Sequence, residues 1–158
     1  MNNGCYYGVM TYNNPIPVAV AMIFNTDRSK VLVGERAIEP SIGGDALMGG
    51  YAEPGETAEG AAQREAREET GRSIDNAPMH YESSSPTANN RMLLFFSTAV
   101  PEVLFDGVED SSEMRNIRFI TPEQLHAKPL CFSLHQSALV TAWAKHRPDL
   151  FPSKTPTP

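Results

Sequence analysis

Three glutamates in the middle of the chain are the residues best suited to chemistry. Glu65, Glu68 and Glu69 lie within the run Arg-Glu-Ala-Arg-Glu-Glu of residues 64–69. Because a helix advances by about 100° per residue, Glu65 and Glu69 share one side of a helix, and Glu68 flanks them. Carboxylate oxygens are the hard ligands that Mg²⁺ and Mn²⁺ prefer. The spacing therefore indicates a divalent-metal site.

The helix expected over residues 57–70 carries its glutamates among small residues. Thr57 is a suitable N-cap, Gly71 stands where the helix ends, and alanines fill the turns between them. On a helical wheel the alanines surround Glu65 and Glu69, so both carboxylates lie on the face that must pack against a sheet. Half-burying two like charges is costly unless a positive charge joins them. An isolated acidic run is usually a solvated helix end, and the helix pattern alone leaves both interpretations open.

Short apolar runs on both sides of this helix predict the sheet that positions it. We expect strands over residues 17–24, 31–33, 46–48, 79–83, 91–100 and 117–120, the first two joined as a hairpin. Thr121 and Pro122 open a short helix, and Ser133 caps a final helix whose apolar face includes Leu134 and Trp143. The pattern predicts a mixed α/β fold.

The composition is that of one globular domain. The chain has 158 residues, of which 41% are hydrophobic and 20% charged, enough to bury a core. We expect this domain over residues 15–147, after an N-terminal segment at 1–14 and before a disordered, proline-rich tail at 148–158. The formal net charge of −6 argues against broad nucleic-acid binding through a basic patch.

Cysteine and histidine spacing gives no second metal site. Cys5 and Cys131 belong to no CxxC pair, which excludes a zinc ribbon built from this chain alone, and two reduced thiols are expected. The histidines show no paired metal spacing and are expected to be ordinary surface or structural residues: His80, His126, His135 and His146. No signal-peptide pattern opens the chain, and its apolar runs are too short to span a bilayer. A cytoplasmic protein without a membrane segment is therefore expected.

The residues around the acidic helix match a longer pattern. Residues 50–72 read GYAEPGETAEGAAQREAREETGR. They resemble the Nudix box, whose seven fixed positions are filled here by Gly50, Glu56, Arg64, Glu65, Glu68, Glu69 and Gly71. Two aliphatic positions depart from the pattern: Ala66 is small at the first, and Arg72 replaces the second. Ile74 is expected to take over the packing after the helix.

The resemblance covers about residues 15–145 and implies an α/β/α sandwich with a mixed central sheet, in which the box folds as loop–helix–loop. It implies hydrolysis of a nucleoside diphosphate linked to another moiety, with Mg²⁺ or Mn²⁺ as cofactor. Glu65 and Glu69 would be the principal metal ligands. Glu68 would be a third ligand or the residue that handles the attacking water, and the carbonyl of Gly50 would complete the metal shell.

The same resemblance suggests supporting residues around the metal site. Glu56 and Arg64 would form a pair that braces the loop against the helix. The general base varies in this family, and Glu68 and Glu113 are the two candidates here. Glu113 precedes the last predicted strand, although a solvated loop acid beside other acidic residues is the alternative for it.

The sequence does not identify the nucleotide substrate. The residues expected to border the pocket are Asn89, Asn90, Arg91 and the 37–45 loop. The candidate substrate-binding residues are Arg36, Asn90 and Arg91. NADH pyrophosphatases resemble the EPGET stretch of the box. They carry an SQPWPFP-like signature downstream, where residues 83–90 of this chain read SSSPTANN, and this difference weakens that assignment.

Two other functions are compatible with this kind of fold. A nucleotide-binding Nudix domain without turnover would be favoured by loss of the box glutamates or by an attached DNA-binding domain, and this sequence shows neither. An isopentenyl-diphosphate isomerase would need a cysteine ahead of the box, and residues 15–50 contain none. The expected partner is therefore a small-molecule nucleotide, and a homodimer is compatible with the sequence.

Overall fold

A seven-stranded sheet with helices on both faces makes up the computed structural model, which describes residues 13–152. Cys5, most of the N-terminal segment and residues 153–158 lie outside the described residues. The strands are β1 (Ile16–Asn25), β2 (Val31–Arg36), β3 (Asp45–Ala46), β4 (Met48–Tyr51), β5 (His80–Pro86), β6 (Arg91–Val100) and β7 (Met114–Ile120). The helices are α1 (Ala58–Thr70), α2 (Pro122–Ala127) and α3 (Ser133–His146), with the 3₁₀ turns η1 (Glu102–Phe105) and η2 (Pro148–Leu150).

The sheet is mixed because its two long central strands are parallel. β1 runs parallel to β6 from the pair Ile16–Arg91 to the pair Asn25–Val100, whereas the other strand pairs are antiparallel. β1 and β2 diverge away from their turn, and β4 pairs with the first half of β1 while β3 pairs with β2. The chain therefore runs from β4, a short strand alongside β1, through a short loop into α1.

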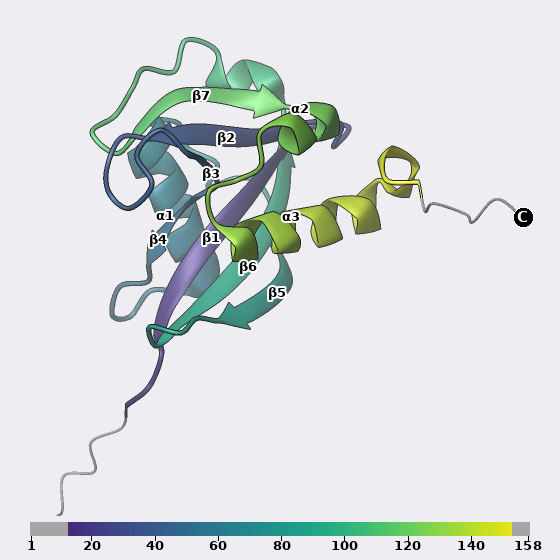
Figure 1. Cartoon of the computed structure of the whole chain (residues 1–158). Coiled ribbons are helices and arrows are strands. Elements are labelled where there is room, and N and C mark those ends of the chain that lie inside the picture. The colour runs from purple at the N-terminus through teal and green to yellow at the C-terminus, as the bar shows by residue number, and fades with distance from the viewer. Residues whose placement is uncertain (1–12, 153–158) are drawn as a thin grey trace, which may run out of the picture.

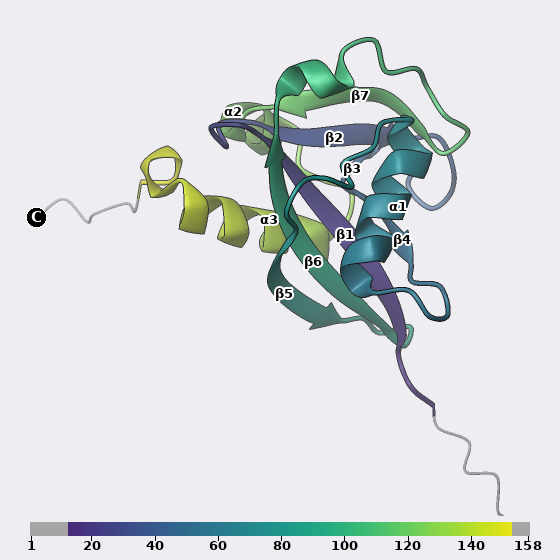
Figure 2. The ribbon, with the colours of Figure 1, turned by 180° about the vertical axis from the view of Figure 1, so that it is seen from behind.

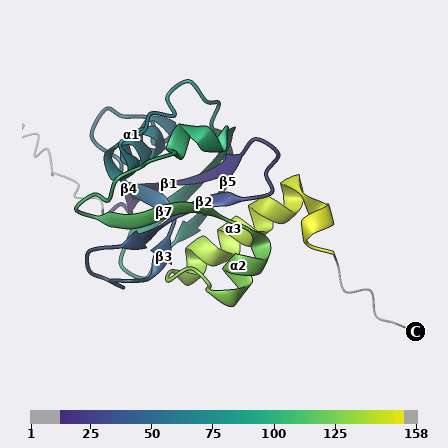
Figure 3. The same ribbon diagram turned by 90° about the horizontal axis from the view of Figure 1, so that it is seen from above.

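The three predicted layers are visible from above, with α1 on one face of the sheet and α2 and α3 on the other (Figure 3). Alternation along β1 explains the arrangement, because successive side chains point to opposite faces. Val20, Met22 and Phe24 pack with Trp143 of α3, whereas the other face of β1 presents the smaller Ala19 and Ala21 toward α1. The predicted α/β/α sandwich with a mixed central sheet is confirmed.

Helix α1 sits close to the sheet because the residues between them are alanines. Ala61, Ala62 and Ala66 are completely buried, and Figure 2 shows α1 in front of β1 and β4. Its predicted ends are confirmed, because the Thr57 hydroxyl accepts from the Gly60 N–H at 3.0 Å and Gly71 takes the left-handed conformation with φ of 70°.

The segment after α1 packs as predicted. Ile74 is buried in the same cluster as Ala62 and Ala66. Arg72 turns outward instead and donates to the Asp106 carbonyl at 2.8 Å. The substitution of an aliphatic residue by arginine in the box therefore leaves the packing after the helix intact.

The first turn of α3 differs from the prediction. Phe132, not Ser133, occupies the N-cap position and makes no side-chain cap. Leu134 was predicted to lie on the buried face, but 38% of it is exposed, whereas Ala138, Leu139 and Trp143 are buried. Both predictions were wrong: the helix begins with Ser133 itself, and Leu134 borders an open cavity rather than the packed sheet.

The domain also continues beyond residue 147. The turn η2 follows α3 directly (Figure 1), and the Phe151 ring lies 5.6 Å from that of Trp143. Leu150 and Phe151 pack against the core on the α3 side of the sheet. The prediction of disorder from residue 148 is therefore wrong as far as residue 152, because these two apolar side chains find a packing surface. No helix within residues 13–152 has the length and apolar character needed to cross a membrane.

Replacing Phe151 by alanine tests this extension. The partly buried ring contacts Trp143, and its loss is expected to lower the free energy of unfolding by about 1–2 kcal/mol. Urea denaturation followed by tryptophan fluorescence would measure it. The exposed neighbour Pro152 is the control, and a Phe151→Ala protein as stable as Pro152→Ala would show that η2 adds nothing to the core.

Candidate active site

Two carboxylates of α1 meet the glycine pair of β4. The Gly49 N–H donates to Oε2 of Glu69 at 3.0 Å, and the Glu69 side chain is buried. A Cβ placed on Gly50 would lie 2.4–2.6 Å from the carboxylate atoms of Glu65. The β4 backbone can therefore lie directly against the Glu65 carboxylate because Gly50 has no side chain, and the missing side chain of Gly49 lets β4 lie close to the β1 backbone at Ala19.

Arg64 links this pair to the loop before the helix. Its Nε donates to Glu56 at 2.9 Å, and its Nη1 donates to Glu65 at 2.8 Å and to Glu68 at 3.1 Å. Its Nη2 donates to the carbonyl of Tyr51 at 2.8 Å. The expected Glu56–Arg64 pair is thus present, and the same guanidinium also orients two of the box glutamates.

The carboxylate pair carries more negative charge than its surroundings neutralise. Burial, together with the charges of Glu65 and Glu113, raises the pKa of Glu69 to about 8, although the hydrogen bond from the Gly49 N–H and the charge of Arg36 act in the opposite direction. Burial also raises the pKa of Glu65, whereas the hydrogen bond from Arg64 lowers it. Since no cation contacts Glu69 among the described side chains, a positive ion at this position would relieve the repulsion.

The donor set fits a hard divalent cation. Within residues 13–152, no three acidic, histidine or cysteine side chains already converge into a closed metal shell. Arg64 instead binds both Glu65 and Glu68. Carboxylate oxygens are nonetheless the ligand type that Mg²⁺ and Mn²⁺ prefer. Here they lie beside the backbone of two glycines, Gly49 and Gly50.

Glu113 lies near the same two carboxylates. It is exposed and immediately precedes β7, and its charge raises the pKa of both Glu65 and Glu69. Its backbone carbonyl accepts from the Ala37 N–H at 2.8 Å, which fixes it beside the loop after β2. The structure thus brings a loop carboxylate to the open side of the pair.

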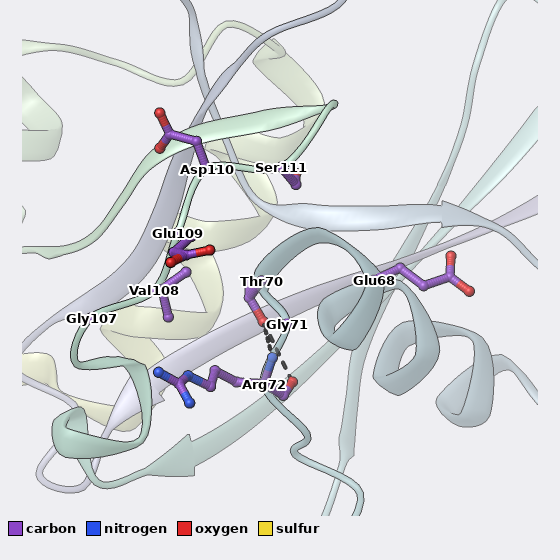
Figure 4. Close-up of a pocket in the computed structure, with 9 residues that line it drawn as sticks. All are labelled: Glu68, Thr70, Gly71, Arg72, Gly107, Val108, Glu109, Asp110 and Ser111. Carbon is purple, nitrogen blue, oxygen red and sulfur yellow. Dashed lines mark hydrogen bonds between the residues drawn. The ribbon is translucent and has the colours of Figure 1, made fainter.

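A polar cleft of about 400 Å³ at the C-terminal end of α1 offers no comparable arrangement (Figure 4). Glu68 borders it but points away from Glu109 and Asp110. Asp110 accepts from the Asn116 N–H at 2.9 Å, and Arg72 is bound to a backbone carbonyl. The acidic side chains here therefore do not converge.

A larger cavity, of about 650 Å³, lies on the α3 face of the sheet. Its apolar floor consists of Val20, Leu47 and Leu93. Gly49 and Tyr51 of β4 also line it. Because the Gly49 N–H binds Glu69, β4 is a common wall between the cavity and the carboxylate pair. We refer to this space as the α3-side cavity.

Two arginines border the α3-side cavity, and each stacks on an aromatic ring. Arg36 lies 5.1 Å from the ring centre of Phe132, and its Nε donates to the Pro40 carbonyl at 2.6 Å. Arg91 lies 5.3 Å from the ring centre of Tyr51. Both predicted arginines therefore line the cavity, together with residues of the loop that follows β2.

The third predicted substrate-binding residue, Asn90, does not reach the cavity. It takes a left-handed conformation with φ of 58° at the turn before β6. Its amide donates to the side chain of Asn13 at 2.9 Å and to the carbonyl of Asn14 at 3.2 Å. The neighbouring Asn89 lines the cavity instead. Turn geometry, which residue type alone does not reveal, decides which asparagine faces the ligand space.

Two residues that line the α3-side cavity at the start of α3 were not predicted as functional. Phe132 and His135 line the α3-side cavity, although the histidine was expected to be structural. Their position depends on where the first turn of α3 meets the sheet, and nothing in their local spacing signals it. Cys131 also borders the cavity, where burial raises the pKa of its thiol and so keeps it protonated.

The two glycines of β4 are expected to respond differently to alanine. The three atoms nearest a Cβ on Gly50 all belong to the flexible end of Glu65, so Gly50→Ala should fold and lose about 10- to 100-fold in kcat through displacement of that carboxylate. A Cβ on Gly49 would lie 2.5 Å from the backbone oxygen of Ala19, so Gly49→Ala should lower the melting temperature instead. Melting curves and initial rates on both variants check this. Equal melting temperatures or an active Gly50→Ala protein would contradict it.

Known proteins include relatives of this chain. The family model described as NUDIX domain matches residues 15–140. A curated protein of Schizosaccharomyces pombe (strain 972 / ATCC 24843), named NAD-capped RNA hydrolase, is 28% identical over 120 residues, which are 75% of this chain and 31% of that protein. The chain thus spans less than a third of the length of that relative.

Solved structures share the fold. A NUDIX hydrolase from Nitrosomonas europaea has a TM-score of 0.70 at 20% identity, covering 85% of this chain and 73% of that chain. The NUDIX domain of Shewanella oneidensis NrtR, complexed with ADP ribose, has a TM-score of 0.70 at 16% identity, covering 92% of this chain and 99% of that chain. At these identities the likeness establishes a common architecture.

Proposed function

The chain belongs to the NUDIX family, whose model covers residues 15–140, and from this premise we propose that it hydrolyses the pyrophosphate bond of a nucleoside diphosphate linked to another moiety. One observation carries the proposal. Glu65 and Glu69 lie against the β4 backbone, and a cavity large enough for part of a nucleotide lies on the other side of that backbone. A substrate that extends past β4 places its diphosphate beside the carboxylates.

The box glutamates would hold a divalent cation, Mg²⁺ or Mn²⁺. Glu65 and Glu69 would be the principal ligands, and Glu68 and the carbonyl of Gly50 would complete the set. Such a cation would offset charge on the phosphate oxygens and lower the pKa of a bound water. Arg64 orients Glu65 and Glu68 through hydrogen bonds of 2.8 and 3.1 Å.

The reaction is attack of a water oxygen on one phosphorus, with cleavage of the bond to the bridging oxygen. A carboxylate accepts the proton of the attacking water. Glu68 and Glu113 both stand near the pair and are the candidates. Glu68 is bound to Arg64 at 3.1 Å, whereas Glu113 is exposed beside the loop after β2. Arg36, at the edge of the α3-side cavity, is placed to meet a phosphate oxygen.

The comparisons narrow the choice of substrates to be tested. The name of the Schizosaccharomyces pombe relative suggests the NAD cap of an RNA, and the ADP ribose of the NrtR complex suggests a free nucleoside diphosphate derivative. The net charge of −6 favours small nucleotides over long RNA, because phosphate-rich chains are repelled by an acidic surface. ADP-ribose is therefore the first substrate to try.

A substrate panel with divalent cations tests the proposal. The purified chain is incubated with ADP-ribose, NADH, NAD-capped RNA, dinucleoside polyphosphates, nucleotide sugars and nucleoside triphosphates, in Mg²⁺ or Mn²⁺. Products are read by chromatography and by phosphate release with a coupled phosphatase. Turnover that disappears with EDTA and in Glu69→Gln would support the hydrolase. If a folded, metal-loaded protein turned over none of these substrates, the result would favour a ligand-binding domain without turnover.

A further inference from the structure

We propose that Arg91 is a positioning residue for the carboxylate pair, because its contact with the Tyr51 ring fixes the end of β4. This role rests on the proposed function, which assigns the Gly50 carbonyl of β4 to the cation. It adds a reason why a strand with two adjacent glycines holds one orientation beside the carboxylates. We refer to the contact as the Arg91–Tyr51 stack. Its effect is measurable on the backbone without metal and on metal binding without substrate.

The end of β4 has few side chains of its own to hold it. Two of its four residues are Gly49 and Gly50, and glycine loses more conformational freedom on folding than any other residue. The peptide unit between Gly50 and Tyr51 carries the carbonyl assigned to the cation, and a peptide unit is planar and rigid. The orientation of that carbonyl therefore depends on how Tyr51, the next residue, is held.

Tyr51 is held both at its backbone and at its ring. Its carbonyl accepts from Nη2 of Arg64 at 2.8 Å, and the same guanidinium binds Glu65 and Glu68. Its ring lines the α3-side cavity, where the guanidinium carbon of Arg91 lies 5.3 Å from the ring centre. Because 48% of Tyr51 is exposed, packing covers only part of this side chain. The stack therefore supplies a contact on the side where packing is open.

Arg91 reaches Tyr51 across the strand that separates them. In the sheet, β1 lies between β6 and β4 (Figure 1). Arg91 lies opposite Ile16 of β1, and Tyr51 lies opposite Val18, two residues further along. The Arg91 backbone is fixed at the turn before β6, where its N–H donates to the Thr87 hydroxyl at 3.1 Å and its carbonyl accepts from the Thr87 N–H at 2.9 Å. The stack thus ties the end of β4 to β6 over β1.

The Arg91 side chain has little else to bind. Its Nε is buried without a hydrogen-bond partner within residues 13–152, so no hydrogen bond at that atom competes with the stack. A guanidinium over an aromatic face is attracted by the charge distribution of the ring, and the attraction grows as water is excluded. The stack is therefore the interaction that orients this guanidinium.

Loss of the stack should reach the carboxylates by two routes. The peptide after Gly50 becomes free to tilt, and the Tyr51 carbonyl holds Arg64 less firmly. Neither route involves the substrate, so the loss should appear in metal affinity and kcat. A direct contact between Arg91 and the substrate would instead raise KM and leave metal affinity unchanged.

Hydrogen exchange followed by mass spectrometry, on the full chain in EDTA, tests the first step without metal or substrate. In Arg91→Ala the amides of residues 49–52 should exchange about tenfold faster than in the wild type. Tyr51→Leu keeps an apolar side chain without an aromatic face and should have the same effect. Combining the two changes should add little, because both remove one contact.

Calorimetric titration with Mn²⁺ in the absence of substrate tests the second step. Arg91→Ala should bind Mn²⁺ about tenfold more weakly than the wild type. With the best substrate, its kcat should fall by a similar factor while KM changes little. Tyr51→Phe keeps the ring and should bind Mn²⁺ more tightly than Tyr51→Leu.

Arg28→Ala is the matched control. The Arg28 guanidinium carbon lies 5.1 Å from the ring centre of Phe24, and its Nη1 is also buried without a partner. It belongs to the turn between β1 and β2 and lines neither of the two cavities described above. This variant should match the wild type in exchange at residues 49–52 and in Mn²⁺ affinity.

The proposal is overturned if Arg91→Ala matches the wild type in either measurement, or if a higher KM is its only change. A wild-type chain that binds no Mn²⁺ would overturn it together with the proposed metal site. Faster exchange at β4 and weaker Mn²⁺ binding, in a protein that turns over no substrate, would uphold the positioning role and refute the hydrolase.

Discussion

Replacing Glu69 by glutamine is expected to lower kcat by about a thousandfold while leaving the fold intact. Glutamine has the same shape, and its amide oxygen can still accept from the Gly49 N–H that now binds the carboxylate at 3.0 Å. It carries no charge, however, so the site loses a principal ligand of the cation. Initial rates on the best substrate of the panel measure the loss. Glu59→Gln, an exposed change on the same helix, is the control.

The same substitution should change how stability depends on pH. Burial raises the pKa of Glu69 from 4.5 to about 8. Between these values the folded protein holds a proton that the unfolded chain releases, so the wild-type free energy of unfolding falls as pH rises through this window. The slope is at most about 1.4 kcal/mol per pH unit. Glu69→Gln lacks this group and should be more stable than wild type at pH 8 in EDTA.

Urea denaturation in EDTA at pH 5, 7 and 9 follows this effect. The wild-type protein should lose stability across the series relative to Glu69→Gln, and Mg²⁺ should restore part of the loss at high pH because it binds only the folded pair. Near-normal turnover of Glu69→Gln would remove Glu69 from the metal site. Parallel stability profiles of the two proteins would show that the buried carboxylate is already neutralised.

Replacing Arg64 by alanine should affect both stability and catalysis. The change leaves Glu65 and Glu56 without their nearest cation and frees the carbonyl of Tyr51. Removing one partner of a largely buried ion pair typically lowers the free energy of unfolding by about 3–5 kcal/mol. Since Glu65 and Glu68 also lose the group that orients them, kcat should fall by about 100-fold. Arg64→Lys should recover little, because a point charge cannot make all of these hydrogen bonds.

Arg67→Ala is the matched control for this experiment. Arg67 lies on the same helix and pairs with Asp75, and both side chains are about half exposed. Its loss should lower stability by less than about 1 kcal/mol and leave kcat unchanged. If Arg64→Ala and Arg67→Ala behaved alike, the network around Arg64 would have no special part in positioning the glutamates.

The parts of the site that the sequence predicted are those formed by local spacing. The helix of the box, its cap at Thr57 and its end at Gly71 depend on neighbouring residues. The shared face of Glu65 and Glu69 follows from helical geometry alone. The layered fold could also be predicted from the sequence, because the strand alternation and helix periodicity of the sequence match the elements of the folded structure.

The parts that were missed are formed by contacts between distant segments. The α3-side cavity joins β1, β4, β6 and α3, and whether Asn89 or Asn90 faces it depends on one left-handed turn residue. His135 was predicted to be an ordinary surface or structural residue, because the residues next to it in the sequence do not indicate which part of the sheet it packs against. The packing of Phe151 on Trp143 likewise required knowing where α3 ends relative to the core.

The common wall formed by β4 has a consequence for what the enzyme releases. If the nucleoside part of the substrate is held in the α3-side cavity on one side of β4 and cleavage occurs on the other, the position of the broken bond depends on how far the substrate extends past this strand. The broken bond is then counted from the nucleoside and not from the far end of the substrate. Substrates with very different distal groups would leave the same nucleotide fragment behind, and the distal group would vary freely as the leaving portion.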